Sequence, residues 1–144
     1  MLGTRLLMID DEEAFVAALE KRLAHRGCTV LAAYNGEDGL KKLDENPDTD
    51  VVLLDVKMPG MDGIETLRRI RASHPLVEVI MLTGHATVES AIDGMRLGAF
   101  DYLMKPADTE MLAQKVQQAC KKRQDHQMRI AEASGKELRR SHAM

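Results

Sequence analysis

Three aspartates stand where two apolar segments of the chain end. Val51 to Asp55 reads VVLLD, and Arg5 to Asp10 reads RLLMID and is followed by Asp11. Apolar runs of this length, stopped by a charge, are typical of strands buried on both faces of a parallel sheet. Open α/β sheets bind ligands beyond the carboxyl ends of their strands. We therefore expect Asp10, Asp11 and Asp55 to meet there, where their oxygens would bind a hard divalent cation, Mg²⁺ or Mn²⁺.

A hydroxyl and an amine are predicted at the same edge of the sheet. Thr83 ends the apolar segment EVIMLT, and Lys105 follows the segment DYLM. With the aspartates they suit phosphoryl transfer to a carboxylate, because Asp55 can supply the nucleophilic oxygen while the cation and Lys105 neutralise the transferred group. Thr83 and the backbone N–H groups beside Gly84 are candidates to bind the remaining phosphoryl oxygens.

Strand and helix patterns alternate along the chain and would position these residues. We expect strands at 5–10, 29–33, 51–55, 78–83 and 101–104, and helices at 13–26, 37–45, 63–73, 87–97 and from 109 onward, after Asp108 as N-cap. Five such alternations predict an α/β fold with a five-stranded parallel sheet and helices on both faces.

Composition places the chain among cytoplasmic globular proteins. It has 144 residues, of which 44% are hydrophobic and 30% charged, enough for one domain with a proper core. Cys28 and Cys120 show no metal-ligand or redox spacing and are expected to be ordinary reduced residues. No signal peptide or membrane-spanning segment is visible, which predicts a cytoplasmic location.

Charge is distributed unevenly along the chain. The net charge is −3, yet from Lys121 onward basic residues outnumber acidic ones. We expect a body at 1–122 and a basic extension at 123–144, which continues the last helix to a break near Ser134 and Gly135 and then becomes a disordered tail. The extension could be a solvated helix, a coiled-coil seam or a linker. It has no aromatic residues and no helix-turn-helix pattern, so direct nucleic-acid binding is not expected.

Four motifs in register resemble the receiver domains of two-component response regulators. They are IDDEE at 9–13, DVKMPGMDG at 55–63, TGHA at 83–86 and FDYLMKP at 100–106. The resemblance covers about residues 3–122, and the run at 83–106 is most similar to NtrC-type receivers. It implies a flavodoxin-like, doubly wound (βα)5 fold with strand order 2-1-3-4-5, and the division of the chain into a receiver domain at 1–122 and an extension at 123–144.

The resemblance also assigns roles to the residues that match these motifs. Asp55 matches the phosphoacceptor, and Asp10 and Asp11 match the acidic pair that binds Mg²⁺, with Asp11 as the direct ligand. The backbone carbonyl of Lys57 matches the third protein ligand. Lys105 matches the lysine that pairs with the phosphoryl oxygens, and the bond that follows it is often cis in the family.

A switch is implied by two further matches. Thr83 matches the hydroxyl that moves to the phosphoryl group, and Tyr102 matches the aromatic residue that swings inward with it. A tyrosine fixed half-buried without switching remains the alternative for Tyr102. Lys57 and His85 occupy variable positions that tune the lifetime of the phosphoryl group in the family. The surface expected to respond comprises 87–97, 101–104 and the start of the last helix.

These observations predict a phosphorylation-activated switch. A histidine kinase or phosphotransfer protein would phosphorylate Asp55, and the signal would pass to a partner or to a homodimer formed through the last helices. The chain would catalyse its own phosphorylation and dephosphorylation without being a turnover enzyme. One alternative is a phosphate-independent interaction module. Another is a Mg²⁺-dependent phosphatase with an aspartyl-phosphate intermediate, but such enzymes usually carry a second aspartate where this chain has Lys57.

Individually, several of these residues also have structural explanations. Asp10 and Asp11 could cap the first helix, and Asp62 is expected to serve the turn and the next helix N-terminus. Lys105 could be a solvated lysine, and His85 is expected to be exposed and non-catalytic. The chain could be a stand-alone regulator, a phosphorelay intermediate or a receiver separated from an output domain.

Overall fold

Strands and helices alternate five times in the computed structural model, which describes residues 3–84 and 87–143, with side chains up to residue 135. The elements are β1 (Arg5–Ile9), α1 (Glu13–His25), β2 (Thr29–Ala33), α2 (Gly36–Glu45), β3 (Val51–Leu54), α3 (Gly63–Ser73), β4 (Glu78–Thr83), α4 (Val88–Arg96), β5 (Asp101–Met104) and α5 (Thr109–Ala143). The predicted elements are confirmed to within a few residues at their ends, except at the end of α5.

The five strands form one parallel sheet in the order β2-β1-β3-β4-β5, which confirms the predicted topology. β1 and β3 are neighbours, with Ile9 opposite Leu54, so the residues that follow these two strands emerge side by side. β4 lies on the other side of β3, and β5 forms the edge beyond it. All strands therefore end at one edge, which we call the carboxyl edge.

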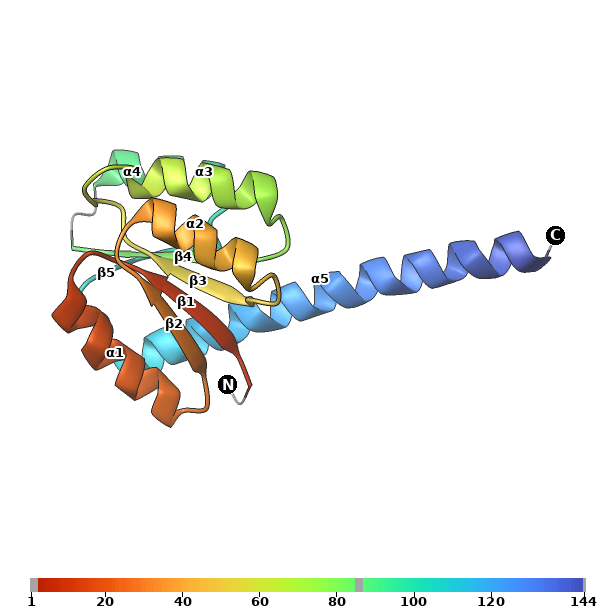
Figure 1. Cartoon of the computed structure of the whole chain (residues 1–144), viewed down its shortest axis with the longest axis horizontal. Coiled ribbons are helices and arrows are strands. Elements are labelled where there is room, and N and C mark those ends of the chain that lie inside the picture. Colours follow the sequence, from red (N-terminus) through yellow and green to blue (C-terminus); the bar gives the residue numbers. More distant parts are fainter. Residues whose placement is uncertain (1–2, 85–86, 144) are drawn as a thin grey trace.

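The sheet separates two hydrophobic cores (Figure 1). α1 and α5 cover one face, where Val16, Leu23 and Val116 pack on alternate strand residues. α2, α3 and α4 lie on the opposite face, where Leu67 and Ile70 belong to the second core. The central strands β1, β3 and β4 are buried on both faces, which explains their nearly continuous apolar sequences.

Side-chain caps begin four of the helices. The Asp62 carboxylate accepts the Glu65 N–H at 2.8 Å, which confirms the predicted role of Asp62 at the start of α3. Asn35 caps α2 in the same way, and Thr87 caps α4. Asp108 accepts the Met111 N–H at the start of α5, as predicted. These caps satisfy N–H groups that have no partner within a helix.

α5 is 35 residues long and runs far beyond the body of the domain (Figure 1). The predicted break near Gly135 is wrong, because the helix continues through this residue to Ala143. A glycine inside a helix costs about 1 kcal/mol relative to alanine and does not by itself end the helix. Residues 128–134 are exposed, so this part of α5 is a solvated helix in the isolated chain.

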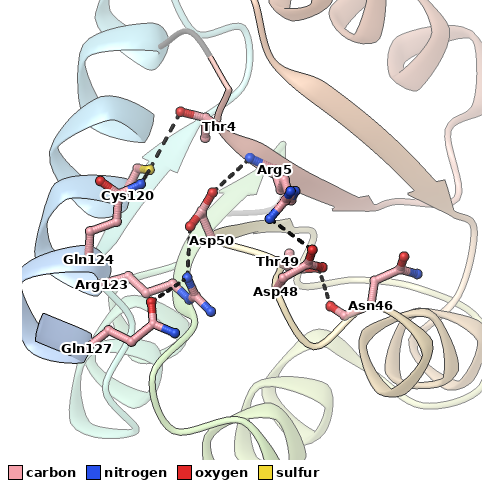
Figure 2. Close-up of polar contacts among 10 residues, drawn as sticks. All are labelled: Thr4, Arg5, Asn46, Asp48, Thr49, Asp50, Cys120, Arg123, Gln124 and Gln127. Carbon is pink, nitrogen blue, oxygen red and sulfur yellow. Dashed lines mark hydrogen bonds and ion pairs between the residues drawn. The ribbon is translucent and has the colours of Figure 1, made fainter. Parts of the chain in front are cut away.

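A buried ion pair holds α5 against the amino-terminal edge of the sheet (Figure 2). The Arg123 guanidinium donates to Asp50 Oδ1 at 2.9 Å, and Asp50 Oδ2 accepts the backbone N–H of Arg5, also at 2.9 Å. Arg123 and Asp50 are only 7% and 5% exposed. The division of the chain at residue 122 stays a prediction, but Arg123 makes its contacts with the body of the domain.

The cysteines are free thiols in this structure. Cys28 and Cys120 are both buried, and burial raises the pKa of each thiol. Cys120 accepts a hydrogen bond from the Thr4 hydroxyl at 3.6 Å (Figure 2). Within the described residues, no helix combines the length and the apolar character that a membrane crossing requires.

Candidate functional site

Three carboxylates meet at the carboxyl edge, as the sequence predicts. Asp10 and Asp55 follow the paired strands β1 and β3, and Asp11 comes next to Asp10. One oxygen from each of the three carboxylates lies within 4.8 Å of the others. Asp10 and Asp55 are almost fully buried, at 3% and 2% exposed, whereas Asp11 faces solvent.

Lys105, which follows β5, brings one ammonium to this cluster. Its backbone N–H donates to the Thr83 carbonyl at 2.9 Å, which ties the end of β5 to the end of β4. The ammonium donates to Asp10 Oδ2 at 2.6 Å and lies 3.8 Å from Asp55 Oδ2. The Lys105 side chain is 10% exposed, so the explanation of a solvated lysine is wrong. The bond from Lys105 to Pro106 is cis.

The charges in this cluster do not balance. Burial raises the pKa of Asp10, although hydrogen bonds from Lys105 and from the Glu12 N–H act in the opposite direction. Burial also opposes the charged form of Lys105, but the bond to Asp10 and the nearby Asp55 outweigh it and raise the Lys105 pKa. The Asp10 pKa thus rises mainly because its carboxylate is desolvated, and the Lys105 pKa rises because several carboxylates surround its ammonium.

The donor set fits a hard divalent cation. Asp55 Oδ1 is buried and has no hydrogen-bond partner among the described residues. A buried carboxylate oxygen without a partner is costly unless another group satisfies it. Three carboxylates against one ammonium leave two negative charges, which one divalent cation would neutralise, and Mg²⁺ accepts such oxygens together with water. Asp11, which is exposed, is open to that water.

The loop after β3 fixes the carbonyl of Asp55 tightly. A Cβ atom added to Gly63 would lie 2.0 Å from the Asp55 carbonyl oxygen and 2.6 Å from the Val56 Cα. The Gly63 N–H donates to the Val56 carbonyl at 2.7 Å. Only a residue without a side chain permits this approach. Lys57 lies in this loop and is exposed, and its carbonyl as a metal ligand stays a prediction.

Thr83 and Tyr102 lie on the neighbouring strands β4 and β5. Thr83 is fully buried at the end of β4. Tyr102 is half-buried, and its hydroxyl shares a 2.6 Å hydrogen bond with the Ser90 hydroxyl on α4. The structure therefore links β5 to α4 through this tyrosine. Whether the tyrosine switches stays a prediction, and His85 lies outside the described residues.

Three residues beside the site were not singled out from the sequence. Ser90 completes the cap of α4, and its hydroxyl forms a hydrogen bond with the Tyr102 hydroxyl. The cap could have been predicted, because Ser90 lies three residues after Thr87. Glu12 lies 3.3 Å from the Lys105 ammonium and belongs to the motif IDDEE. The Phe15 ring lies beneath the same ammonium, and no local pattern points to that contact.

α1 begins without a side-chain cap, so Asp10 and Asp11 do not cap this helix. Its N-cap residue is Glu12, and no side chain accepts a hydrogen bond there as a cap. Asp10 Oδ1 accepts the Glu12 N–H at 2.9 Å, while its other oxygen binds Lys105. The proposed capping role of Asp10 and Asp11 is therefore wrong as the main explanation of this pair.

Known proteins resemble this chain in sequence and in fold. Residues 6–117 match the family described as "Response regulator receiver domain". The chain is 37% identical over 120 residues to "DNA-binding transcriptional regulator NtrC" of Escherichia coli K12, covering 83% of this chain and 25% of that protein. It is 40% identical over 116 residues to "Regulatory protein AtoC" of the same strain, covering 80% and 25%. The chain thus spans about a quarter of the curated relatives it matches.

A solved structure agrees over nearly its whole length. The CheY-like response regulator receiver domain protein from Methanospirillum hungatei JF-1 superposes with a TM-score of 0.81 at 30% sequence identity. The match covers 86% of this chain and 98% of that structure. It confirms the predicted flavodoxin-like arrangement of strands and helices.

Proposed function

This chain belongs to the response regulator receiver family, and from that premise we propose that it is a phosphorylation-controlled switch with Asp55 as phosphoacceptor. The observation that carries the proposal is the position of the Asp55 carboxylate beside the acidic pair and 3.8 Å from the Lys105 ammonium. The phosphoryl donor is a histidine kinase or a phosphotransfer protein, and we place the reaction in the cytoplasm.

In the proposed reaction an Asp55 oxygen attacks the phosphorus of the donor. The bond from phosphorus to the donor histidine nitrogen breaks as the bond to Asp55 forms, and the nitrogen keeps the electron pair. Asp10, Asp11, Asp55 and the Lys57 carbonyl would hold Mg²⁺ or Mn²⁺, which supplies positive charge to the phosphoryl oxygens. Lys105 donates a hydrogen bond to one of these oxygens, and the Thr83 hydroxyl donates to another. The chain catalyses these steps on itself and turns over no separate substrate.

The response would pass from Thr83 through Tyr102 to α4. If Thr83 moves toward the phosphoryl group, Tyr102 can turn inward only after it leaves its hydrogen bond with Ser90. Exposed large apolar side chains support an output surface here, because Val88 on α4 is 79% exposed and Met104 on β5 is 62% exposed. We propose that this surface binds a partner protein or a second copy of the chain.

The phosphatase alternative has less support. Lys57, two residues after Asp55, is exposed and is not an acid, so the usual general acid/base is missing from that position. A phosphate-independent module would not require Asp55, Thr83 and Lys105 at one site, as they are here.

The test is intact mass spectrometry of the full chain after incubation with Mg²⁺ and acetyl phosphate. Wild type should gain the mass of one phosphoryl group, and Asp55→Asn should gain none while keeping the circular dichroism spectrum of wild type. Chelation of the metal should abolish the gain. A phosphorylated Asp55→Asn variant would disprove the assignment of the acceptor.

A further inference from the structure

We propose that Phe15 is a positioning residue for Lys105, and that its ring fixes the ammonium beside Asp55 for phosphoryl transfer. The inference rests on the proposed function, because it names a residue that supports the proposed reaction. Phe15 lies in the first turn of α1, and Lys105 follows β5. The Lys105 ammonium lies over the Phe15 ring, 4.1 Å from the ring centroid.

The ring and the carboxylates hold the ammonium in different ways. Asp10, Glu12 and Asp55 offer oxygens at 2.6, 3.3 and 3.8 Å from Lys105 Nζ. Asp10 and Glu12 each accept a hydrogen bond from one N–H of the ammonium, and Asp55 attracts it by charge. The ring face attracts the charge as a whole, so it restrains the position of Nζ without accepting a conventional hydrogen bond.

This difference matters once a divalent cation and a phosphoryl group occupy the site. In the present structure the shortest contact of Lys105 is with Asp10, which is also a proposed metal ligand. Asp10 holds the ammonium less strongly when its charge is shared with a divalent cation. The contact with Phe15 is independent of that change. It keeps the ammonium close to Asp55, where a phosphoryl oxygen needs a donor.

Glu12 is a poorer candidate for the same task. Its side chain is 54% exposed, so water screens its attraction for the ammonium. Phe15, by contrast, is half-buried and packs against the core between α1, α5 and the sheet. Packing fixes the ring, and a fixed ring can fix the ammonium above it.

The chain offers a matched control. Phe100 is also half-buried and packs against the same core, and the ammonium of Lys122 lies 5.7 Å from its ring centroid. Lys122 lies on α5, outside the proposed site. Phe100→Leu therefore makes the same chemical change as Phe15→Leu in the same core without touching Lys105.

The experiment uses the full chain and compares wild type with Phe15→Leu, Phe15→Tyr and Phe100→Leu. The first readout is the rate of phosphoryl gain from acetyl phosphate at saturating Mg²⁺. Phe15→Leu should be slower by about three- to tenfold, as the loss of a partly desolvated cation–π contact implies. Phe15→Tyr should keep the wild-type rate because it keeps the ring, and Phe100→Leu should also keep it.

A second readout needs neither metal nor phosphodonor. Protons on the Lys105 ε-carbon lie near the ring face, so their NMR signals should be shifted upfield in ¹³C-lysine-labelled protein, with Lys105→Arg to assign them. The shift should be lost in Phe15→Leu and kept in both Phe15→Tyr and Phe100→Leu. Retention of the shift in Phe15→Leu would overturn the contact itself.

The outcomes separate this inference from the proposed function. A wild-type chain that takes no phosphoryl group overturns the proposed function and this inference with it. If wild type is phosphorylated and Phe15→Leu is phosphorylated at the same rate, only the positioning role of Phe15 is overturned. Equal slowing in Phe15→Leu and Phe100→Leu also overturns it, because general core packing would then explain the effect.

Discussion

Removal of the Arg123 charge should destabilise the whole domain, because it leaves a buried carboxylate behind. In Arg123→Met the Asp50 carboxylate loses its charged partner and keeps the backbone N–H of Arg5, at 2.9 Å (Figure 2), and the neutral Cys120 thiol. Asp50 is 5% exposed, so water cannot replace the lost partner without rearrangement. Breaking such a buried pair from one side costs about 3–5 kcal/mol.

This loss is large compared with the total stability of a domain of this size. Single domains unfold with a free energy of about 5–15 kcal/mol, so a loss of about 3–5 kcal/mol removes roughly a fifth of the stability or more. Urea unfolding followed by circular dichroism at pH 7 measures the change, and a constant slope against urea concentration checks that only stability has changed.

A lysine on the same helix provides the control. Lys121 is 79% exposed and pairs with Asp125 at 3.5 Å, so Lys121→Met should change the unfolding free energy by less than about 0.5 kcal/mol. The double variant Asp50→Asn with Arg123→Met should recover at least half of the loss, because the buried charge is gone and the asparagine oxygen can still accept the Arg5 N–H.

The reasoning would be refuted if Arg123→Met lost no more than Lys121→Met. That result would mean that the guanidinium and the carboxylate are not buried together in solution. A double variant no more stable than Arg123→Met alone would show instead that the cost comes from packing of the arginine stem rather than from the stranded charge.

Four further predictions concern the site and the long helix. Gly63→Ala should lower the unfolding free energy by more than about 2 kcal/mol and slow phosphoryl uptake, because the new Cβ atom would collide with the Asp55 carbonyl. Gly94→Ala is the control and should be tolerated in the same urea titration, because the atom nearest to its new Cβ would be 3.5 Å away. Asp10→Asn should be more stable than wild type at pH 7 without Mg²⁺. Burial raises the pKa of Asp10, so the folded state binds the carboxyl proton more tightly than the unfolded state, and wild type loses stability as pH rises from the unfolded pKa through the folded one. The stability difference between Asp10→Asn and wild type should therefore shrink toward a pH of about 4, the ordinary pKa of an aspartate. An unchanged stability difference at that pH would contradict the reasoning. Mg²⁺ at ten times its Kd should add about 1.4 kcal/mol to wild type and less to this variant. Deletion of the residues after Gln127 should change the unfolding free energy by less than about 0.5 kcal/mol, since residues 128–134 are exposed, and a larger loss would show that this part of α5 packs on the body.

Local sequence patterns were sufficient for the alternation of strands and helices and for the membership of the carboxylate cluster, whereas the strand order came from the resemblance to receiver domains. Continuous apolar segments identified the strands buried on both faces, and the aspartates that follow β1 and β3 marked the carboxyl edge. Since parallel strands all end at one edge, Asp10 and Asp55 had to come together once β1 and β3 were neighbours. The cap formed by Asp62 was also predictable, because a cap depends only on residues three positions apart.

Contacts between distant side chains were decided only by the tertiary structure. Phe15 meets Lys105, and Asp50 meets Arg123, across separations of 90 and 73 residues. Nothing local distinguishes Phe15 from any other apolar residue of an amphipathic helix, or Arg123 from the other basic residues of its segment. The rotation of α1 and α5 on the sheet determines which side chains turn toward Lys105 and Asp50. That rotation results from the packing of the whole core, which no short stretch of sequence encodes.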